Sequence, residues 1–193
     1  EPVVWRGLPI FIAIGLFSPA SLTVLGFSYD RAVVQIPEAR QALALALDRD
    51  ALVAQFFPDR EAAMSQFTPP GMVAAPHFDG LLYNLAQAQA AFSAAGYPGC
   101  AQMPEKLIVL VPNDAPIWPE LGTAIILQWS AALGCAPALF EVKTLSRALM
   151  IELSHSTYDP EKVTRSHLWL ATWSADYPDA NAWISDALHC RYG

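Results

Sequence analysis

The alternation of short apolar runs with helical segments between residues 106 and 172 constrains the fold of this chain more than any other feature. Strands are expected at 106–111, 138–142 and 167–172, with helices at 116–133 and 146–153 between them. A strand–helix–strand–helix–strand order predicts an α/β fold, in which a parallel sheet is covered by helices on both faces through right-handed crossovers. The last run is so apolar that its strand is expected to be buried on both faces.

The first half of the chain predicts further elements around that β-α-β-α-β unit. Strands are expected at 8–17 and 22–27, and helices at 37–47, 48–57 and 85–95. Asp48 or Asp50 can cap the second helix, and Asn84 can cap the third. Glycines end two helices, with Gly96 after the third and Gly134 after the long helix of the second half.

An aromatic stretch with a carboxylate, WSADYPD at 173–179, directly follows the last predicted strand. Pro178 cannot continue a strand, because it lacks an N–H and has a fixed φ. Asp176 is therefore expected at or just beyond the carboxyl end of a central strand, which is where ligands bind in open α/β sheets. A carboxylate between Trp173 and Tyr177 can hold a cationic group together with an apolar one. The spacing leaves an alternative open, in which Asp176 caps a turn and the rings belong to the core.

Composition excludes several classes of partner. The chain has 193 residues, is 54% hydrophobic and only 15% charged, and carries a formal net charge of −7. Such a composition fits buried parallel strands or a piece of a larger protein. No basic stripe is present, so we expect no nucleic acid partner, and an acidic surface favours cationic or neutral ligands. Trp118 and Trp129 lie eleven residues apart on one predicted helix and are expected to pack in the core.

Motifs for catalysis, metal binding and nucleotide binding are missing from the sequence. No two histidines lie three or four residues apart on a predicted helix, and HExxH does not occur. GxSxG, GxGxxG and GxxxxGK[ST] are also absent. We therefore predict an α/β domain with a possible pocket that is not an enzyme and has no metal and no cofactor.

The three cysteines, Cys100, Cys135 and Cys190, each follow a turn or end a segment, and none belongs to a CxxC pair. One hypothesis is a Cys100–Cys135 disulfide, which would place the protein outside the cytoplasm. Cys190 would then need a partner beyond this piece of chain. The alternative is three buried thiols.

Four stretches, in this order, resemble family 5 of the extracellular solute-binding proteins, the oligopeptide- and dipeptide-binding receptors of ABC importers. They are ARQALALALDRD at 39–50, TPPG at 68–71, the alanine-rich segment 86–98 that ends in AGYP, and WSADYPD at 173–179 followed by Asn181. The resemblance implies a type II periplasmic-binding-protein-like lobe. It also implies that the chain is a C-terminal lobe fragment, with hinge-proximal strands at 1–30 and one ligand-binding lobe, incomplete at both ends, at 31–193.

The resemblance also implies a function. The protein would be the substrate-binding component of an ABC importer and would capture a short peptide or similar small solute in a cleft between two lobes. Asp176 would receive the α-ammonium group of a peptide, and Trp173, Tyr177 and Asn181 would line the same site. The implied partners are the membrane subunits of the transporter. The protein is expected to be a monomer, periplasmic or extracellular, and either lipid-anchored or soluble.

Two departures from the family pattern affect the ligand. Well-known peptide binders have a basic residue three positions before the motif tryptophan, where this chain has Leu170, and often a cysteine after it, where this chain has Ser174. Other members of the family bind nickel complexes or sugars. The alternative function is the ligand-sensing domain of a transcription regulator with the same fold, which upstream sequence would distinguish.

Overall fold

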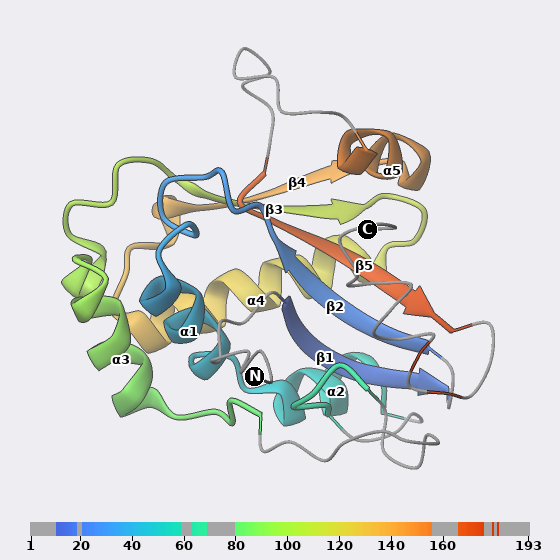
Figure 1. Cartoon of the computed structure of the whole chain (residues 1–193), viewed down its shortest axis with the longest axis horizontal. Helices are drawn as coiled ribbons and strands as arrows, with labels where there is room; N and C mark the ends of the chain where they lie inside the picture. Colours follow the sequence, from blue (N-terminus) through green and yellow to red (C-terminus); the bar gives the residue numbers. More distant parts are fainter. Residues whose placement is uncertain are drawn as a thin grey trace, which may run out of the picture.

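The computed structural model describes residues 11–18, 21–58, 63–68, 80–155, 166–175, 179 and 181, and for 11–18 and 152–155 it describes the backbone alone. Five strands form one sheet in the order β1-β2-β5-β3-β4 (Figure 1). The strands are β1 (Phe11–Ser18), β2 (Ser21–Phe27), β3 (Leu107–Pro112), β4 (Phe140–Leu145) and β5 (Leu168–Ser174).

The sheet combines a parallel half with an antiparallel half. Strand β3 pairs in parallel with both β4 and β5, which confirms the predicted β-α-β-α-β unit. Strand β2 pairs antiparallel with β1 and with β5, so the predicted parallel unit is extended on one side by two antiparallel strands. For β1 and β2 the physical reason is the length of their connection. Only two residues separate β1 from β2, whereas a parallel crossover needs a dozen or more.

Five α-helices accompany the sheet within the described residues: α1 (Pro37–Leu45), α2 (Arg49–Phe56), α3 (Leu85–Ala94), α4 (Ile117–Leu133) and α5 (Arg147–His155). Several of their ends follow the predictions. The carboxylate of Asp48 accepts from the backbone N–H of Ala51, and the side chain of Asn84 accepts from the backbone N–H of Gln87. Helix α4 ends at Gly134, whose φ of 69° lies in the left-handed region.

Helix α4 closes one face of the sheet. Its buried residues Leu121, Ile125 and Trp129 belong to the same core cluster as Val109 and Val111 of β3. The indole N–H of Trp129 donates to the carbonyl of Leu43 at 2.9 Å, so that the core also ties α4 to α1. The prediction that Trp129 packs in the core is confirmed.

Helix α5 belongs to the other crossover. Strands β4 and β5 lie on opposite sides of β3, so the connections through α4 and α5 run in opposite directions along the sheet. Two right-handed crossovers of opposite direction place their helices on opposite faces. This arrangement agrees with the predicted helices on both faces.

The pair formed by β2 and β5 has two unlike faces. We call the face with Leu25, Phe27, Leu168 and Leu170 the core face, since all four belong to the core cluster. The opposite, outer face carries Leu22, Val24 and Gly26 of β2, which pair with Trp173, Ala171 and Trp169 of β5, respectively. Trp169 is 36% exposed. The prediction that this strand is buried on both faces is therefore wrong for its outer face.

Among the residues that the structure describes, no helix combines the length and the apolar character that a membrane span requires.

Candidate functional site

The carboxyl ends of the three parallel strands point toward one edge of the sheet, although β5 pairs with β3 only at Leu168 and Trp169 and then diverges from it (Figure 1). Strand β3 ends at Pro112, β4 at Leu145 and β5 at Ser174, and β3 lies between the other two. Connections that leave β3 and β4 in opposite directions create a topological switch point, where open α/β sheets bind ligands. This edge is therefore the first place to look for a site, as the sequence predicted.

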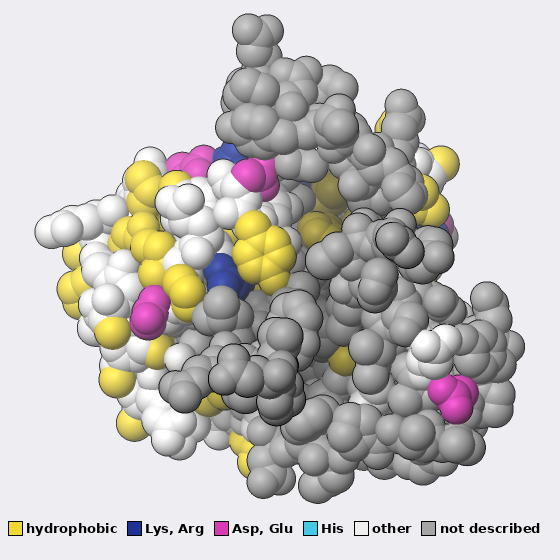
Figure 2. Space-filling view, in the orientation of Figure 1, with side chains coloured by type: hydrophobic (Ala, Val, Ile, Leu, Met, Phe, Trp, Pro, Cys, Tyr) yellow, Lys and Arg dark blue, Asp and Glu magenta, His cyan; other side chains and the backbone are white. Residues whose placement is uncertain are grey.

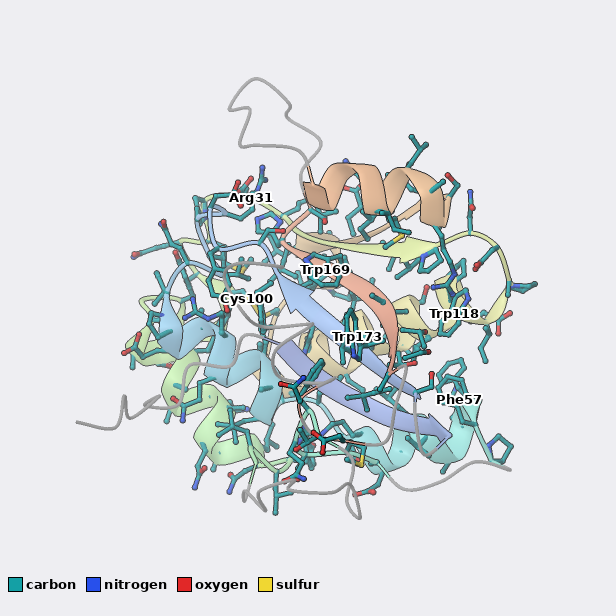
Figure 3. The ribbon with its side chains drawn as sticks, turned by 45° about the vertical axis from the view of Figure 1, so that its right-hand side comes forward. Arg31, Phe57, Cys100, Trp118, Trp169 and Trp173 are labelled. Carbon is teal, nitrogen blue, oxygen red and sulfur yellow. A yellow bond between two sulfur atoms is a disulfide. The ribbon has the colours of Figure 1, made fainter. Side chains whose placement is uncertain are left out.

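Trp173 lies at this edge, one residue before the end of β5 (Figure 3). It stands on the outer face and is partly buried, paired with Leu22. Its indole N–H is buried and has no hydrogen-bond acceptor within the described part of the chain. A buried donor without an acceptor costs about 1–3 kcal/mol, so each such group requires an explanation.

The other predicted site residues are placed less completely. Asp176 and Tyr177 lie outside the described residues, so their roles stay predictions. The backbone N–H of Asn181 donates to the carboxylate of Asp179 at 2.8 Å, and Asn181 is exposed. The hydroxyl of Ser174 lies 3.2 Å from that of Ser21 and forms a hydrogen bond with it, which fixes the end of β5 to the start of β2.

A charged and aromatic cluster at the same edge was not predicted. Arg147, at the start of α5, pairs with Asp114, which follows β3, and its guanidinium carbon lies 5.3 Å from the ring centroid of Trp118. Trp118 is partly buried and packs against the core, which confirms the prediction of core packing. The sequence offered one signal for this cluster. Each of its residues comes soon after a predicted strand or opens the helix that follows that strand. The pair is well exposed, so its contribution to stability is small.

Leu170 has no exposed surface and lies on the core face, opposite to Trp173. A residue at this position of β5 therefore points into the core in this chain. Well-known peptide binders of the family have a basic residue at this position, and the leucine of this chain agrees with its burial.

His167, just before β5, is completely buried and holds strands together. Its Nδ1 accepts from the backbone N–H of Ile108 at 3.1 Å, and its Nε2 lies 3.2 Å from Glu105, which also pairs with Arg31. Burial, followed by the nearby Arg31, lowers the pKa of His167 below 6.5, while Glu105 and Asp30 oppose this shift. The neutral ring is thus a structural group at the opposite end of β5 from Trp173.

The motif helix at 39–50 is also structural. Arg40 is almost fully buried, donates to the carbonyls of Val34 and Gln35 at 2.7 and 3.0 Å, and lies over the ring of Tyr29. Arg49 is buried and donates to the carbonyl of Leu81. Both arginines therefore hold loops against the helices, and burial lowers the pKa of each.

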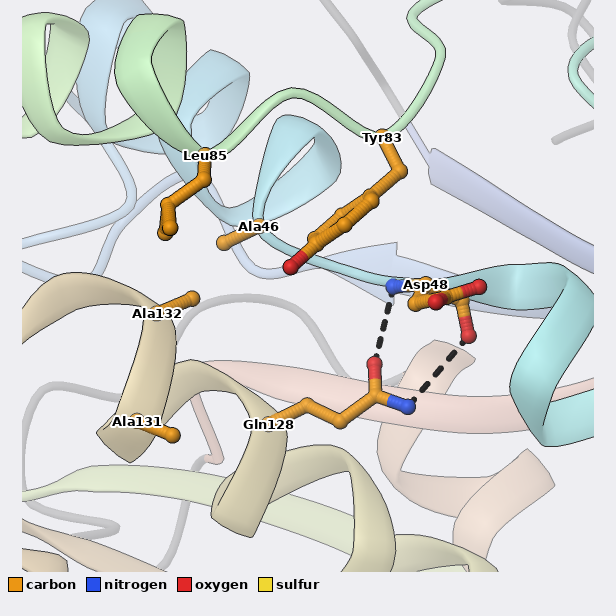
Figure 4. A pocket seen from close by; sticks show the side chains of 7 residues that line it. All are labelled: Ala46, Asp48, Tyr83, Leu85, Gln128, Ala131 and Ala132. Atoms are coloured by element: carbon orange, nitrogen blue, oxygen red, sulfur yellow. Dashed lines mark hydrogen bonds between the residues drawn. The ribbon is translucent and has the colours of Figure 1, made fainter.

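A pocket of about 290 Å³ lies away from the carboxyl edge, in the helical layer (Figure 4). It is lined by Ala46, Asp48, Tyr83, Leu85, Gln128, Ala131 and Ala132. The amide of Gln128 is fully engaged by the backbone N–H and carbonyl of Asp48, at 2.8 and 3.3 Å. The pocket therefore offers few free polar groups to a ligand, and we do not assign the site to it.

Two further observations bear on chemistry. Within the described residues, no group of three or more His, Cys, Asp or Glu side chains could hold a metal ion. On the face shown in Figure 2, hydrophobic and uncharged side chains dominate the described surface.

A disulfide joins Cys100 to Cys135. Cys100 lies in the 3₁₀ turn Pro98–Cys100, which follows α3, and Cys135 lies just after α4. The two Cα atoms lie 5.2 Å apart, and both residues are buried. The structure thus joins the same two cysteines as the sequence hypothesis, and closes a separation of 35 residues.

The sequence matches the family model of the bacterial extracellular solute-binding proteins, family 5 Middle, over residues 14–193. The fold is similar to that of the murein tripeptide binding protein MppA of Escherichia coli, with a TM-score of 0.71 and 18% identity, over 94% of this chain and 34% of that one. The oligopeptide-binding protein OppAIV of Borrelia burgdorferi gives a TM-score of 0.73 and 18% identity, over 96% and 34% of the two chains. Haemophilus influenzae OppA in complex with RPPGFSPFR gives 0.66 and 19%, over 95% and 34%.

The chain thus spans about a third of the length of these solved structures. No curated protein matches the sequence. The family match and the shared fold confirm the predicted resemblance and the periplasmic-binding-protein-like α/β fold. The division of the chain at residue 30 stays a prediction.

Proposed function

The chain belongs to family 5 of the bacterial extracellular solute-binding proteins, and from that premise we propose that it forms one lobe of the substrate-binding component of an ABC importer. The ligand is a short peptide or similar small solute, held in a cleft between this lobe and another. The protein binds its ligand without chemical change and delivers it to membrane subunits. The two lobes close on the ligand by a hinge motion.

The observation that carries the proposal is the buried, unpartnered indole N–H of Trp173 at the carboxyl edge. A carbonyl group of a bound ligand is a suitable acceptor, because it would satisfy the donor without a new charge. The aromatic ring beside that N–H adds an apolar surface. A site with one polar donor and one apolar wall suits a peptide, which offers both kinds of group at every residue.

Peptide is favoured over other solutes by two further arguments. MppA is named for a murein tripeptide, and the Haemophilus influenzae protein is in complex with a peptide. The net charge of −7 favours a ligand with a cationic end. We assign that end to Asp176, with Tyr177 and Asn181 beside it, because Asp176 directly follows the edge that Trp173 occupies.

The disulfide supports the proposed location. Disulfides persist in oxidising compartments, so the Cys100–Cys135 bond supports a periplasmic or extracellular site of action. The same bond argues against a cytoplasmic regulator of transcription with this fold.

Thermal unfolding of the protein in its complete natural form tests the ligand class. The panel contains di- to pentapeptides, sugars and nickel. A ligand at about 100 times its dissociation constant adds about 2.7 kcal/mol to the free energy of unfolding, which raises the midpoint visibly. A rise with peptides supports the proposal, and a rise with sugars or nickel alone would overturn the peptide assignment.

Substitution Asp176→Asn tests the role of that carboxylate. A charge-assisted hydrogen bond to an ammonium group contributes about 1.5–3 kcal/mol. The variant should therefore bind a peptide with a free amino terminus about 10- to 100-fold more weakly, with little change for the acetylated peptide. Equal losses for both peptides would remove Asp176 from the ammonium role.

A further inference from the structure

The loops that follow β3 and β4 meet at the carboxyl edge of the sheet. The connection after β3 leads to α4 on one face and the connection after β4 leads to α5 on the other, so the crevice of the switch point opens between these two strands. The backbone N–H of Asn113 donates to the carbonyl of Leu145 at 2.9 Å and ties the two loops together. Figure 3 shows Trp118, which lies in the first turn of α4, at this end of the sheet.

Arg147 is held from two sides at the point where these loops meet. Its Nε–H donates to the carboxylate of Asp114, and its guanidinium carbon lies 5.3 Å from the ring centroid of Trp118. The backbone on which it stands is also fixed, because the hydroxyl of Ser146 accepts from the backbone N–H of Leu149 at 3.3 Å and caps α5. The guanidinium is therefore oriented before any ligand arrives.

Most of the hydrogen-bonding capacity of Arg147 remains unused. A guanidinium carries five N–H donors, of which Nε supplies one and the two Nη groups supply the others. Within the described part of the chain, Asp114 is the only hydrogen-bond acceptor of Arg147, and it is bound through Nε. The side chain of Arg147 is 39% exposed, so a ligand at this edge can reach it.

Stability does not explain this arrangement. An ion pair as exposed as that of Arg147 and Asp114 contributes little to the folded state. An oriented guanidinium with free Nη donors matches the two oxygens of a carboxylate, which it can bind through two parallel hydrogen bonds. Because the net charge of −7 repels an anion from the molecule as a whole, a carboxylate needs local donors of this kind in order to bind.

We infer that Arg147 is a specificity-determining residue, which binds a carboxylate of the ligand at the crevice between β3 and β4. Asp114 and Trp118 hold the guanidinium in place for that contact. The inference rests on the proposed function, because it takes the ligand to be a small solute bound at the carboxyl edge. The carboxylate comes either from the chain end of a peptide or from an acidic side chain, and the test separates these two sources.

Three sets of peptides test the inference on the protein in its complete natural form, with binding measured by calorimetry. The first set contains alanine peptides of two to five residues with a free carboxyl end. The second contains their amides, which have no carboxylate. The third contains the same amides with one Ala replaced by Glu, at each position in turn. At least one peptide with a carboxylate should bind about 10- to 100-fold more tightly than the plain amide of the same length.

Variants of Arg147 assign that preference. Arg147→Met keeps an apolar stem over Trp118 but loses the charge, so it should bind the carboxylate peptide as weakly as the amide, while the affinity for the amide stays unchanged. Arg147→Lys should retain part of the preference. Lys143→Met is the matched control, because Lys143 pairs with Glu141 within β4 and its side chain is 40% exposed, and it should change neither affinity.

The thermal midpoint of each variant is measured first to check folding, and Arg147→Gln replaces Arg147→Met if the latter does not fold. Equal affinities of the wild type for all three sets would overturn the inference, as would a preference for the carboxylate that survives in Arg147→Met. An equal loss for carboxylate peptide and amide would show a merely structural role and would also overturn it. Absence of binding by any of the peptides would overturn the proposed function as well.

Discussion

The core face and the outer face of the β2–β5 pair are built from the same strands, yet their side chains are buried to different degrees. On the core face, Leu25 and Leu170 are completely buried by the helices and by each other. On the outer face, Trp169 keeps over a third of its surface exposed, and the indole N–H of Trp173 has no acceptor in the described chain. Each face keeps one buried polar group without a partner in the described chain, Thr23 on the core face and Trp173 on the outer face, but only the outer face also keeps a large exposed ring.

The difference leads to a simple expectation. Substitutions on the core face should lower the free energy of unfolding and leave the choice of ligand unchanged. Substitutions on the outer face should change the choice of ligand and lower the free energy of unfolding less. The four predictions below run from the largest effect on stability to the smallest. Those for Leu170 and Trp169 test the two faces, and those for the disulfide and His167 test other buried groups.

Substitution Leu170→Ala should produce the largest loss in the free energy of unfolding. Removal of a fully buried leucine leaves a cavity and costs about 2–5 kcal/mol. Denaturant unfolding measures the loss, and the peptide preferences of the folded fraction should remain those of the wild type. A loss below about 1 kcal/mol would show that the core face is less tightly closed than the structure indicates.

Removal of the disulfide should cause the second-largest loss in the free energy of unfolding. A covalent closure across 35 residues contributes about 2–4 kcal/mol, and both cysteines lie in the core cluster. Substitution of both Cys100 and Cys135 by serine should lower the midpoint by a corresponding amount, and reductant should lower the midpoint of the wild type but not that of the variant. Free thiols at both positions in protein isolated without reductant would contradict the bond.

His167 should make stability depend on pH. Its pKa lies below 6.5 in the folded state, so the unfolded state binds more protons in this range. The stabilising contribution is complete above pH 6.5 and is lost as the pH falls from there toward the folded pKa. His167→Gln, which cannot titrate but retains an acceptor for Ile108, should weaken this dependence, while His167→Ala should cost about 1–3 kcal/mol at pH 7. A pH profile of unfolding identical in all three proteins would exclude His167 as the titrating group.

Substitution Trp169→Ala should have the smallest effect, although it removes the largest side chain. The ring is fixed on one side only, so we expect a loss of about 1–2 kcal/mol, below that of its neighbour Leu170. The two variants, compared in one unfolding series, test the contrast between the faces directly. A larger loss for Trp169→Ala than for Leu170→Ala would reverse the assignment of the two faces.

Local patterns predicted most of the secondary structure. The alternation of runs gave β3, α4, β4, α5 and β5 in the right order, because apolar periodicity is set by residues close in sequence. The caps at Asp48 and Asn84 and the end of α4 at Gly134 were predictable for the same reason, since each depends on one residue and its neighbours. The start of β4 was predicted two residues too early, because Pro137 opens a 3₁₀ turn there.

The candidate site was predictable only in part. The place of Trp173 at the carboxyl edge follows from the end of a strand, which the sequence marks. The cluster of Arg147, Asp114 and Trp118 was missed, because it joins residues after β3 to residues after β4. Those residues meet only when the two strands pair.

By itself, the sequence determined the α/β class, the order of the elements, the family and the motif that marks the candidate site. These depend on residue type and spacing along the chain. Only the tertiary structure decided that β2 joins β5 antiparallel, that Leu170 enters the core and that Trp169 crosses Gly26 on the outer face. A strand has two faces with the same spacing, and its apolar residues do not show which face the rest of the protein will cover, so the choice depends on the packing of segments far apart in the sequence.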